Sequence, residues 1–467
     1  MIGKRLKILI LSAAVCAIPS FARADIPAGD PPKEQAAAPV PESAAEQPAE
    51  LPKEESKSFW AYSEEWFTRR LNVLAFGNVQ DPAHSTQNPD NAFLQAPRYT
   101  AQLELRPDLI VDTPILGWTF KPRVTATSLW WTDGVMKGEE DRQARFFVNE
   151  WLFQPKPEDW LFVSFGKEKQ LWGPSFLVSP SNILFKDTEK TNPKSEVEGK
   201  YLARLVWLPS KALTVTGIAE TQREESSFGE PMRPVRLVKI DVQGENAMAS
   251  VIGYLQQHER FRIGSYGQWT ASDAVVLYYD GILSRGTDAL YPALDPANPV
   301  GGSFVQPYAA SDRPFATVAA GGSYTFLSGE TVSLEGLYNG AGYSDAEADA
   351  FYALRAGAAG HLFDAAPVSG LSRMTLAQAL FPGTPFLRRA YVLAQVQERE
   401  IANVLDVMVR YVRSLEERSG QVSTIIEWQA TKRLQVFNIN TFAVGDRDKE
   451  FNSLLSKSFL AGVEMHF

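Results

Sequence analysis

The stretch Tyr99–Asp112 reads YTAQLELRPDLIVD and decides the fold class of this chain. Its apolar positions are Tyr99, Ala101, Leu103, Leu105, Leu109 and Val111, and they alternate with Thr100, Gln102, Glu104, Arg106, Asp108 and Asp112. Successive side chains of a β-strand point to opposite faces. The stretch therefore predicts a strand with one apolar face and one charged face.

The same period of two returns along the chain, for example at residues 118–131, 403–413 and 421–430. These segments are longer than the mean globular strand of about 5–6 residues. A soluble sandwich would have shorter strands and a less charged second face. Long strands that are apolar on one side and ionic on the other are typical of a transmembrane barrel with a wet lumen.

The pattern predicts 18 strands, with 16 as the alternative count because the first strand and the region 344–387 are weakly patterned. The expected strands are 71–79, 99–112, 118–131, 144–154, 160–171, 200–208, 212–222, 235–243, 248–257, 261–270, 274–283, 314–326, 331–343, 388–397, 403–413, 421–430, 434–443 and 456–467. Short and long connections alternate, as in up-and-down antiparallel outer-membrane barrels. An even number of strands places both termini on one side, the periplasm.

The first 70 residues differ from the rest. Residues 1–24 have a basic start, an apolar run and a small-residue cleavage motif, which together predict a secretory signal peptide. Residues 25–58 are rich in Pro, Ala and acidic residues without an aromatic, so we expect a disordered linker. Residues 59–70 carry Trp and Phe at helical spacing and predict a short amphipathic helix. The barrel is expected to occupy residues 71–467.

Two local patterns connect the chain with a known class. The last strand alternates apolar residues and ends on Phe467, which resembles the terminal signature of bacterial outer-membrane barrels and implies recognition by the barrel-assembly machinery. The stretch 166–173, GKEKQLWG, looks like a strand end of porin-like and alginate-export-like barrels. By similarity to porins, the following loop to Gly199 would fold into the lumen and form a constriction, with the alternative of a simple capping turn. The candidate constriction residues are Trp172, Gly173, Pro174, Ser179 and Asn182.

Composition and motifs argue against several other classes. The net charge of -9 disfavours a nucleic-acid binder, and the single cysteine, Cys16, excludes a disulfide scaffold. The four histidines are far apart and no metal-ligand spacing or nucleophile motif is present. The nearest candidates for rim catalysis are the pairs His84–Ser85 and His258–Glu259, both interpreted as loop residues. We therefore expect no enzyme activity, no metal and no cofactor.

Charged residues at the polar phase of the strands are the candidate pore lining, because water must reach so many charges. They are Glu104, Arg106, Lys121, Arg123, Arg204, Glu220, Lys239, Asp241, Arg410 and Glu427. Arg106 and Arg123 lie on neighbouring expected strands and would form part of a basic ladder that selects solutes by sign. The alternative is that opposite charges pair along the wall.

The first functional hypothesis is a porin-type channel of the bacterial outer membrane for passive diffusion of small hydrophilic or anionic solutes. The second is an export channel for a polysaccharide or another envelope component. A rim hydrolase and a closed structural barrel are further alternatives. The expected partners are outer-membrane lipids and lipopolysaccharide, the barrel-assembly machinery and small solutes, with a homo-oligomer left open and no nucleic acid.

Overall fold

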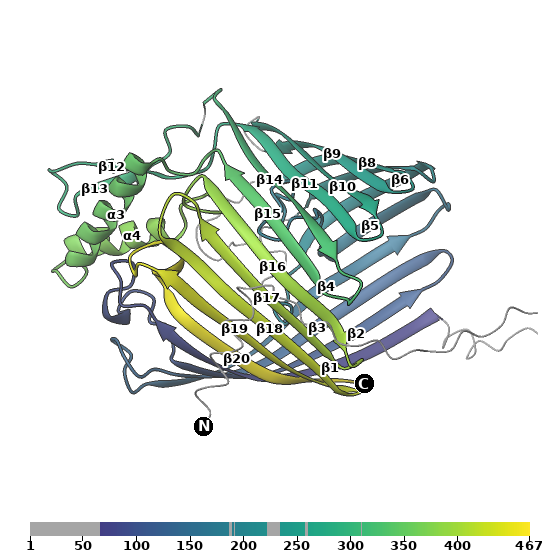
Figure 1. Ribbon diagram of the computed structural model, residues 1–467, viewed down its shortest axis with the longest axis horizontal. Helices are drawn as coiled ribbons and strands as arrows, with labels where there is room; N and C mark the ends of the chain where they lie inside the picture. Colours follow the sequence, from purple (N-terminus) through teal and green to yellow (C-terminus); the bar gives the residue numbers. More distant parts are fainter. Residues whose placement is uncertain (1–65, 186–188, 191, 222–233, 257–259, 310) are drawn as a thin grey trace, which may run out of the picture. The chain divides into compact units, whose positions relative to one another are not determined.

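A computed structural model describes residues 66–185, 189–190, 192–221, 234–256, 260–309 and 311–467, and they form an antiparallel barrel (Figure 1). The barrel strands are β1 (Phe67–Pro82), β2 (Tyr99–Asp112), β3 (Leu116–Trp130), β4 (Glu140–Pro155), β5 (Leu161–Glu168), β6 (Lys200–Ser210), β7 (Leu213–Glu220), β8 (Val235–Gln243), β9 (Ala247–Gln256), β10 (Arg260–Ser272), β11 (Val275–Arg285), β14 (Pro314–Thr325), β15 (Thr331–Asn339), β16 (Ala390–Ile401), β17 (Leu405–Ser414), β18 (Ser419–Thr431), β19 (Leu434–Gly445) and β20 (Leu455–His466).

The sheet has 18 strands and is closed, because β1 pairs with both β2 and β20. Each barrel strand from β2 to β19 pairs with the barrel strands before and after it. Closure leaves no unpaired sheet edge. The all-β barrel predicted from the sequence is confirmed, and the count is 18 rather than 16.

Strand β15 shows why the alternating pattern produces this wall. Ser333, Glu335 and Leu337 are buried, whereas Leu334 and Tyr338 between and after them are 59% and 53% exposed. Large exposed apolar side chains occupy the same phase on most other strands of the barrel. The outer wall is therefore apolar and the inner face carries the polar residues.

The structure corrects the expected start of the barrel. Strand β1 begins at Phe67, so residues 67–70 of the expected helix are part of a strand. Phe67 pairs with Val111 and Arg69 with Leu109, so the backbone groups of this segment are satisfied by the β-ladder. Residues 59–65 of that helix, the signal peptide and the linker lie outside the described residues. Within the described residues, no helix has the length and apolar character needed to cross a bilayer.

Long connections gather at one end of the barrel and carry secondary structure that the strand pattern did not predict. The β15–β16 connection contains α3 (Asp345–Gly360) and α4 (Val368–Leu380), and the β11–β14 connection contains β12 (Tyr291–Leu294) and β13 (Gly302–Val305). Short 3₁₀ helices, η1 (Pro89–Asn91) and η2 (Glu450–Asn452), lie in two other long connections. Helix α3 begins at a capping box, in which Ser344 and Glu347 each bind the backbone N–H of the other.

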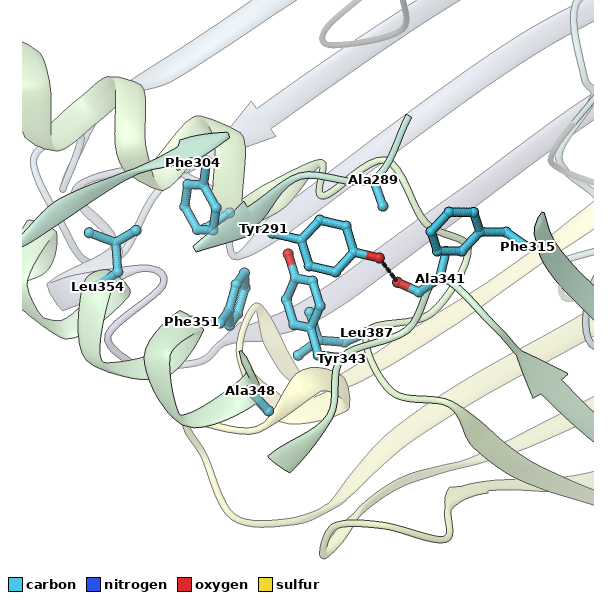
Figure 2. Close-up of a cluster of buried hydrophobic side chains, with 11 residues drawn as sticks. Ala289, Tyr291, Phe304, Phe315, Ala341, Tyr343, Ala348, Phe351, Leu354 and Leu387 are labelled. Atoms are coloured by element: carbon cyan, nitrogen blue, oxygen red, sulfur yellow. Dashed lines mark hydrogen bonds between the residues drawn. The ribbon is translucent and has the colours of Figure 1, made fainter. Parts of the chain in front are cut away.

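We call α3, α4 and the β12–β13 hairpin the cap; its elements lie together beyond the strand ends (Figure 1). Its core is a cluster of aromatic and aliphatic side chains that includes Tyr291, Tyr343 and Phe351 (Figure 2). The Tyr291 hydroxyl donates to the Ala341 carbonyl at 3.0 Å. The cap also contacts the β1–β2 loop, where Gln87 Nε2 donates to the Leu376 carbonyl at 2.9 Å. The cap thus connects loops from distant strands of the barrel.

Candidate functional site

The described residues of the connection between β5 and β6 (169–185, 189–190 and 192–199) lie inside the barrel, and we call them the crossing loop. Its described residues bind side chains from the polar faces of β2, β3, β11, β15, β18 and β20. Because these strands lie in widely separated parts of the wall, the crossing loop traverses the lumen. The porin-based expectation that this loop enters the barrel agrees with these contacts, and the capping-turn alternative does not.

Glu335 of β15 forms the first attachment point. Its carboxylate is fully buried and accepts hydrogen bonds from Ser175 Oγ at 2.6 Å, Phe176 N at 2.7 Å and Leu177 N at 2.9 Å. Hydrogen bonds to a charged acceptor contribute about 1.5–3 kcal/mol each. Three donors on one carboxylate therefore hold this part of the crossing loop in a defined position.

Asp280 of β11 forms the second attachment point, close to the first in the wall. Its carboxylate is fully buried and accepts from Ser179 Oγ at 2.6 Å and Ser181 N at 2.8 Å. Gly173 fits against this site with φ +94°, and a Cβ atom there would collide with Ser179 Oγ and the Asp280 carboxylate. Glycine is thus required both by the backbone conformation and by the close approach.

Arg123 of β3 forms the third attachment point on a different part of the wall. Its side chain is 2% exposed, and its guanidinium binds Glu196 of the crossing loop through Nε at 2.5 Å and Nη2 at 2.9 Å. Asp108 lies 3.0 Å from Nη2. Burial acts to raise the pKa of Glu196, but the Arg123 hydrogen bonds and the charge of Arg106 hold it below its ordinary value. The pair is bidentate and charged, which makes it a strong and oriented contact.

Lys194 forms the fourth attachment point and reaches two acidic strand residues. Its ammonium lies 2.7 Å from Glu427 Oε1 of β18 and 2.9 Å from Glu464 Oε2 of β20. The Lys194 carbonyl accepts from Arg106 Nη2 at 2.7 Å. The same short segment of the crossing loop is therefore bound to β2, β3, β18 and β20.

Lys190 is a luminal cation bound mainly by backbone carbonyls. Its Nζ donates to the carbonyls of Gly173 and Ser175. Burial lowers the pKa of Lys190, opposed by the nearby charges of Glu335 and Asp280. The ammonium thus links the segment that carries Glu189 and Lys190 to the segment that begins at Trp172.

The predicted pore-lining residues all belong to the polar phase of their strands, but they are paired rather than free. Lys121 lies 2.9 Å from Glu150, Arg204 3.1 Å from Glu168, Lys239 2.8 Å from Asp241, Glu220 3.4 Å from Lys200, and Arg106 2.9 Å from Glu104, while Arg410 donates to Gln395 at 2.9 Å. The expected basic ladder of Arg106 and Arg123 is therefore wrong, because both guanidiniums are occupied by carboxylates and carbonyls. The pairing alternative describes the wall correctly, and a role of these residues in permeation stays a prediction.

The predicted constriction residues lie in the first part of the crossing loop. The Trp172 indole donates to the Ser181 carbonyl at 3.2 Å, and Asn182 Nδ2 donates to the Gln170 carbonyl at 3.0 Å. Ser179 and Gly173 contact Asp280 as described. Pro174 is half-buried and stands between Gly173 and Ser175, the residue that donates to Glu335. Phe467 pairs through its backbone with Leu71, and its side chain is 64% exposed. Its role as an assembly signal stays a prediction.

Sequence reasoning missed the residues that hold the crossing loop: Asp280, Glu335, Ser175, Lys190, Lys194 and Glu196. Asp280 and Glu335 carry a detectable signal, since each is an acidic residue at the polar phase of an expected strand. The loop residues carry none, because a loop has no period from which the direction of a side chain can be inferred.

The candidates for catalysis are not assembled into a catalytic arrangement in the described part of the chain. His84 lies 3.7 Å from Asp90 and 3.8 Å from Asp133, while Ser85 Oγ donates to the Ser453 carbonyl instead of facing the imidazole. Residues His258 and Glu259 lie outside the described residues. Among the residues described, no group of three His, Cys, Asp or Glu side chains is placed to hold a metal ion.

Comparison with known proteins gives a fold relationship. No protein-family model matches the chain, and no curated protein matches its sequence. Among solved structures, the chain is similar to OccK11 (OpdR) of Pseudomonas aeruginosa, with a TM-score of 0.50 and 10% identity over 86% of this chain and 96% of that one. OccK7 (OpdD) of the same organism matches with a TM-score of 0.50 and 10% identity over 86% of this chain and 98% of that one. The chain therefore has the barrel fold of these two Pseudomonas proteins.

Proposed function

We propose that the protein is a passive channel of the bacterial outer membrane for small hydrophilic solutes, anions included. The observation that carries this proposal is the crossing loop, bound by charged side chains to separate parts of a polar inner wall. A barrel of 16–18 strands leaves an aqueous passage unless loops fill it. A loop held across the lumen narrows that passage to a defined constriction, which is how a diffusion channel limits solute size.

The outer wall supports a membrane location. Its apolar positions are exposed, and aromatic residues occupy both ends of neighbouring strands. Tyr99 pairs with Trp130 at the long-loop end, and Trp118 pairs with Phe153 at the short-turn end. Aromatic belts at the two membrane interfaces are typical of outer-membrane barrels. The chain enters the barrel at the start of β1 and leaves it at the end of β20, and both points lie at the rim that carries the short turns. We assign this rim to the periplasm.

The pairing of the luminal charges supports weak selection by sign. Each carboxylate or guanidinium that is already compensated presents a local dipole instead of a net charge, so it attracts a permeating ion less strongly. We therefore expect polar solutes of either sign to pass, with size set by the crossing loop. No cofactor or energy input is part of this proposal.

The test is reconstitution of the purified mature protein in a planar lipid bilayer, with recording of single-channel conductance and reversal potential. We expect stable conductance steps and a modest ion preference. A folded protein that gives no conductance would contradict the passive channel and favour the export alternative, which would require partner proteins.

A further inference from the structure

A groove of about 740 Å³ lies on the barrel wall across β20, β1, β2, β3 and β4. The small residues Ala75, Gly77, Ala101, Ala126, Ala144 and Ala461 line it. They are cross-strand partners of one another or of Leu103 and Val463, so they share one face of the sheet. Leu103 is 46% exposed and adjoins the buried luminal residue Glu104, which identifies this face as the outer one.

The groove differs from the rest of the outer wall. Leu, Ile, Val, Phe and Trp side chains project from the corresponding positions of β5 to β11, for example Phe165, Leu205 and Ile240. Where these side chains are replaced by Ala and Gly, the wall recedes toward the backbone. Because an empty apolar cavity loses dispersion contacts, a groove that faces the bilayer is occupied by a lipid chain or by another protein.

Cations are concentrated at the long-loop end of the groove. Arg142 lines the groove, is exposed and forms no ion pair with any described residue. Lys457 lies 3.5 Å from Asp81, and Arg98 binds the same carboxylate. Three successive outward-facing pairs of β1 and β20 connect the groove to this rim. They are Gly77 with Ala461, Val79 with Phe459, and Asp81 with Lys457.

On the outward phase of these strands the rim carries Arg142 and Lys457 together with Asp81 and Glu140, and Arg98 adds a third cation by binding Asp81. It lies level with Tyr99 and Trp130, the pair assigned above to the membrane interface. This is the depth at which the phosphates of a membrane lipid lie, and guanidinium groups bind phosphate well.

We propose that this groove binds a phosphorylated, multiply acylated glycolipid of the lipopolysaccharide type. One acyl chain occupies the groove, and a phosphate binds the cations of the rim. The charge of the rim favours this occupant over a second copy of the chain, because an isologous dimer about an axis along the membrane normal would bring the same cations together. The proposal rests on the membrane location proposed above but not on transport.

The test is native mass spectrometry of the full protein after exchange into detergent, with added deep-rough lipopolysaccharide or phosphatidylglycerol as probes. We expect one glycolipid retained per chain, and at least a roughly tenfold loss of affinity in the double variant Arg142→Gln, Lys457→Gln. Ala126→Leu, which fills the groove without a change of charge, should lower the affinity in the same way.

Matched controls lie on the outer wall away from the groove. Arg413→Gln removes an exposed arginine at the long-loop end of β17, and Ala394→Leu enlarges a small outward residue of β16; both should retain the glycolipid. Heat-dependent migration on a denaturing gel verifies that each variant is folded, and bilayer conductance reports transport separately.

Equal retention in the groove variants and the controls would overturn the proposal, as would equal affinity for phosphatidylglycerol. A dimer mass that disappears in Ala126→Leu would assign the groove to self-association instead. Loss of conductance with retained glycolipid would contradict the proposed channel and leave this inference standing.

Discussion

At the scale of single residues, the lumen is organised by buried carboxylates and guanidiniums that bind the crossing loop. Glu335 and Asp280 are both fully buried, yet every donor described around them comes from the backbone or a hydroxyl of that loop. A buried charge is stable only when its hydrogen bonds are satisfied. The wall and the loop therefore depend on each other.

Glu335→Gln should loosen the crossing loop. The amide keeps the size of the side chain but loses the negative charge, and its NH₂ group opposes one of the three donors. We expect a destabilisation of about 2–4 kcal/mol and a larger or noisier single-channel conductance. Glu330→Gln, at an exposed turn between β14 and β15, is the matched control and should behave as the wild type. Identical conductance in the two variants would show that Glu335 does not position the loop.

Arg123→Gln should shift the ion selectivity toward cations. The change takes the guanidinium away from Asp108 and leaves Glu196 with only the weaker contact to Arg106 at 3.8 Å, so the lumen gains net negative charge. Reversal potentials in a salt gradient measure the shift. Arg145→Gln, at an exposed luminal position of β4, removes the same charge without freeing a paired carboxylate, and an equal shift there would refute the proposed cause.

At the scale of elements, the crossing loop behaves as one structural unit whose conformation depends on a single glycine. The segment from Trp172 to Ser181 turns back on itself, so that the Ser179 hydroxyl oxygen lies 2.6 Å from the Trp172 carbonyl oxygen. Gly173 permits this turn to lie directly against Asp280. A change in one residue should therefore move the whole segment.

Gly173→Ala should displace the crossing loop and alter conductance, in addition to the cost of about 1 kcal/mol or more for alanine at positive φ. Gly138→Ala separates the two effects, because Gly138 has φ +87° with open space around its Cβ position. We expect both variants to lower the midpoint of thermal unfolding and only Gly173→Ala to change the conductance. A conductance change in both variants would contradict the claim that the collision of the added Cβ atom with Ser179 and Asp280 displaces the loop.

At the scale of the whole molecule, Glu450, a residue of η2 outside the spanning strands, binds the chain where it passes from the cap into β16. Its carboxylate accepts from Leu387 N at 2.8 Å and from the Tyr391 hydroxyl at 2.5 Å. Burial raises the pKa of Glu450 to about 7, with the charge of Glu417 adding to the shift and Arg388 opposing it. The folded protein thus binds this proton more tightly than the unfolded chain, in which a glutamate has a pKa of about 4.3.

The contribution of Glu450 to stability should therefore fall as the pH rises from about 4.3 to about 7, because over that range the folded state retains a proton on this group that the unfolded state has lost. Thermal unfolding at a series of pH values should show this decrease in the wild type. Glu450→Gln should reduce the decrease by removing the titrating group, whereas Glu400→Gln, at an exposed position near the end of β16, should preserve it. The same pH slope in all three proteins would contradict the assignment.

The alternation of side chains along the chain was sufficient to predict the barrel, its 18 strands and the polar inner phase. A strand has a strict period of two, so the pattern reports local geometry directly. For the same reason the sequence placed Arg106 of β2 and Arg123 of β3 correctly on the inner face. It did not predict their partners Lys194 and Glu196, because these residues come from a loop without a period.

The sequence alone determined the architecture of this protein, since local periodicity and the lengths of connections are sufficient to specify an antiparallel closed sheet. The tertiary structure decided which charges are free. Arg106 and Arg123 look like a basic ladder in the sequence, but contacts between residues distant in the chain pair them with carboxylates and carbonyls. The same is true of the cap and of the outer groove. Both form where strands or loops that are far apart in the sequence come into contact, and the pattern of residue types along the chain does not predict such long-range contacts.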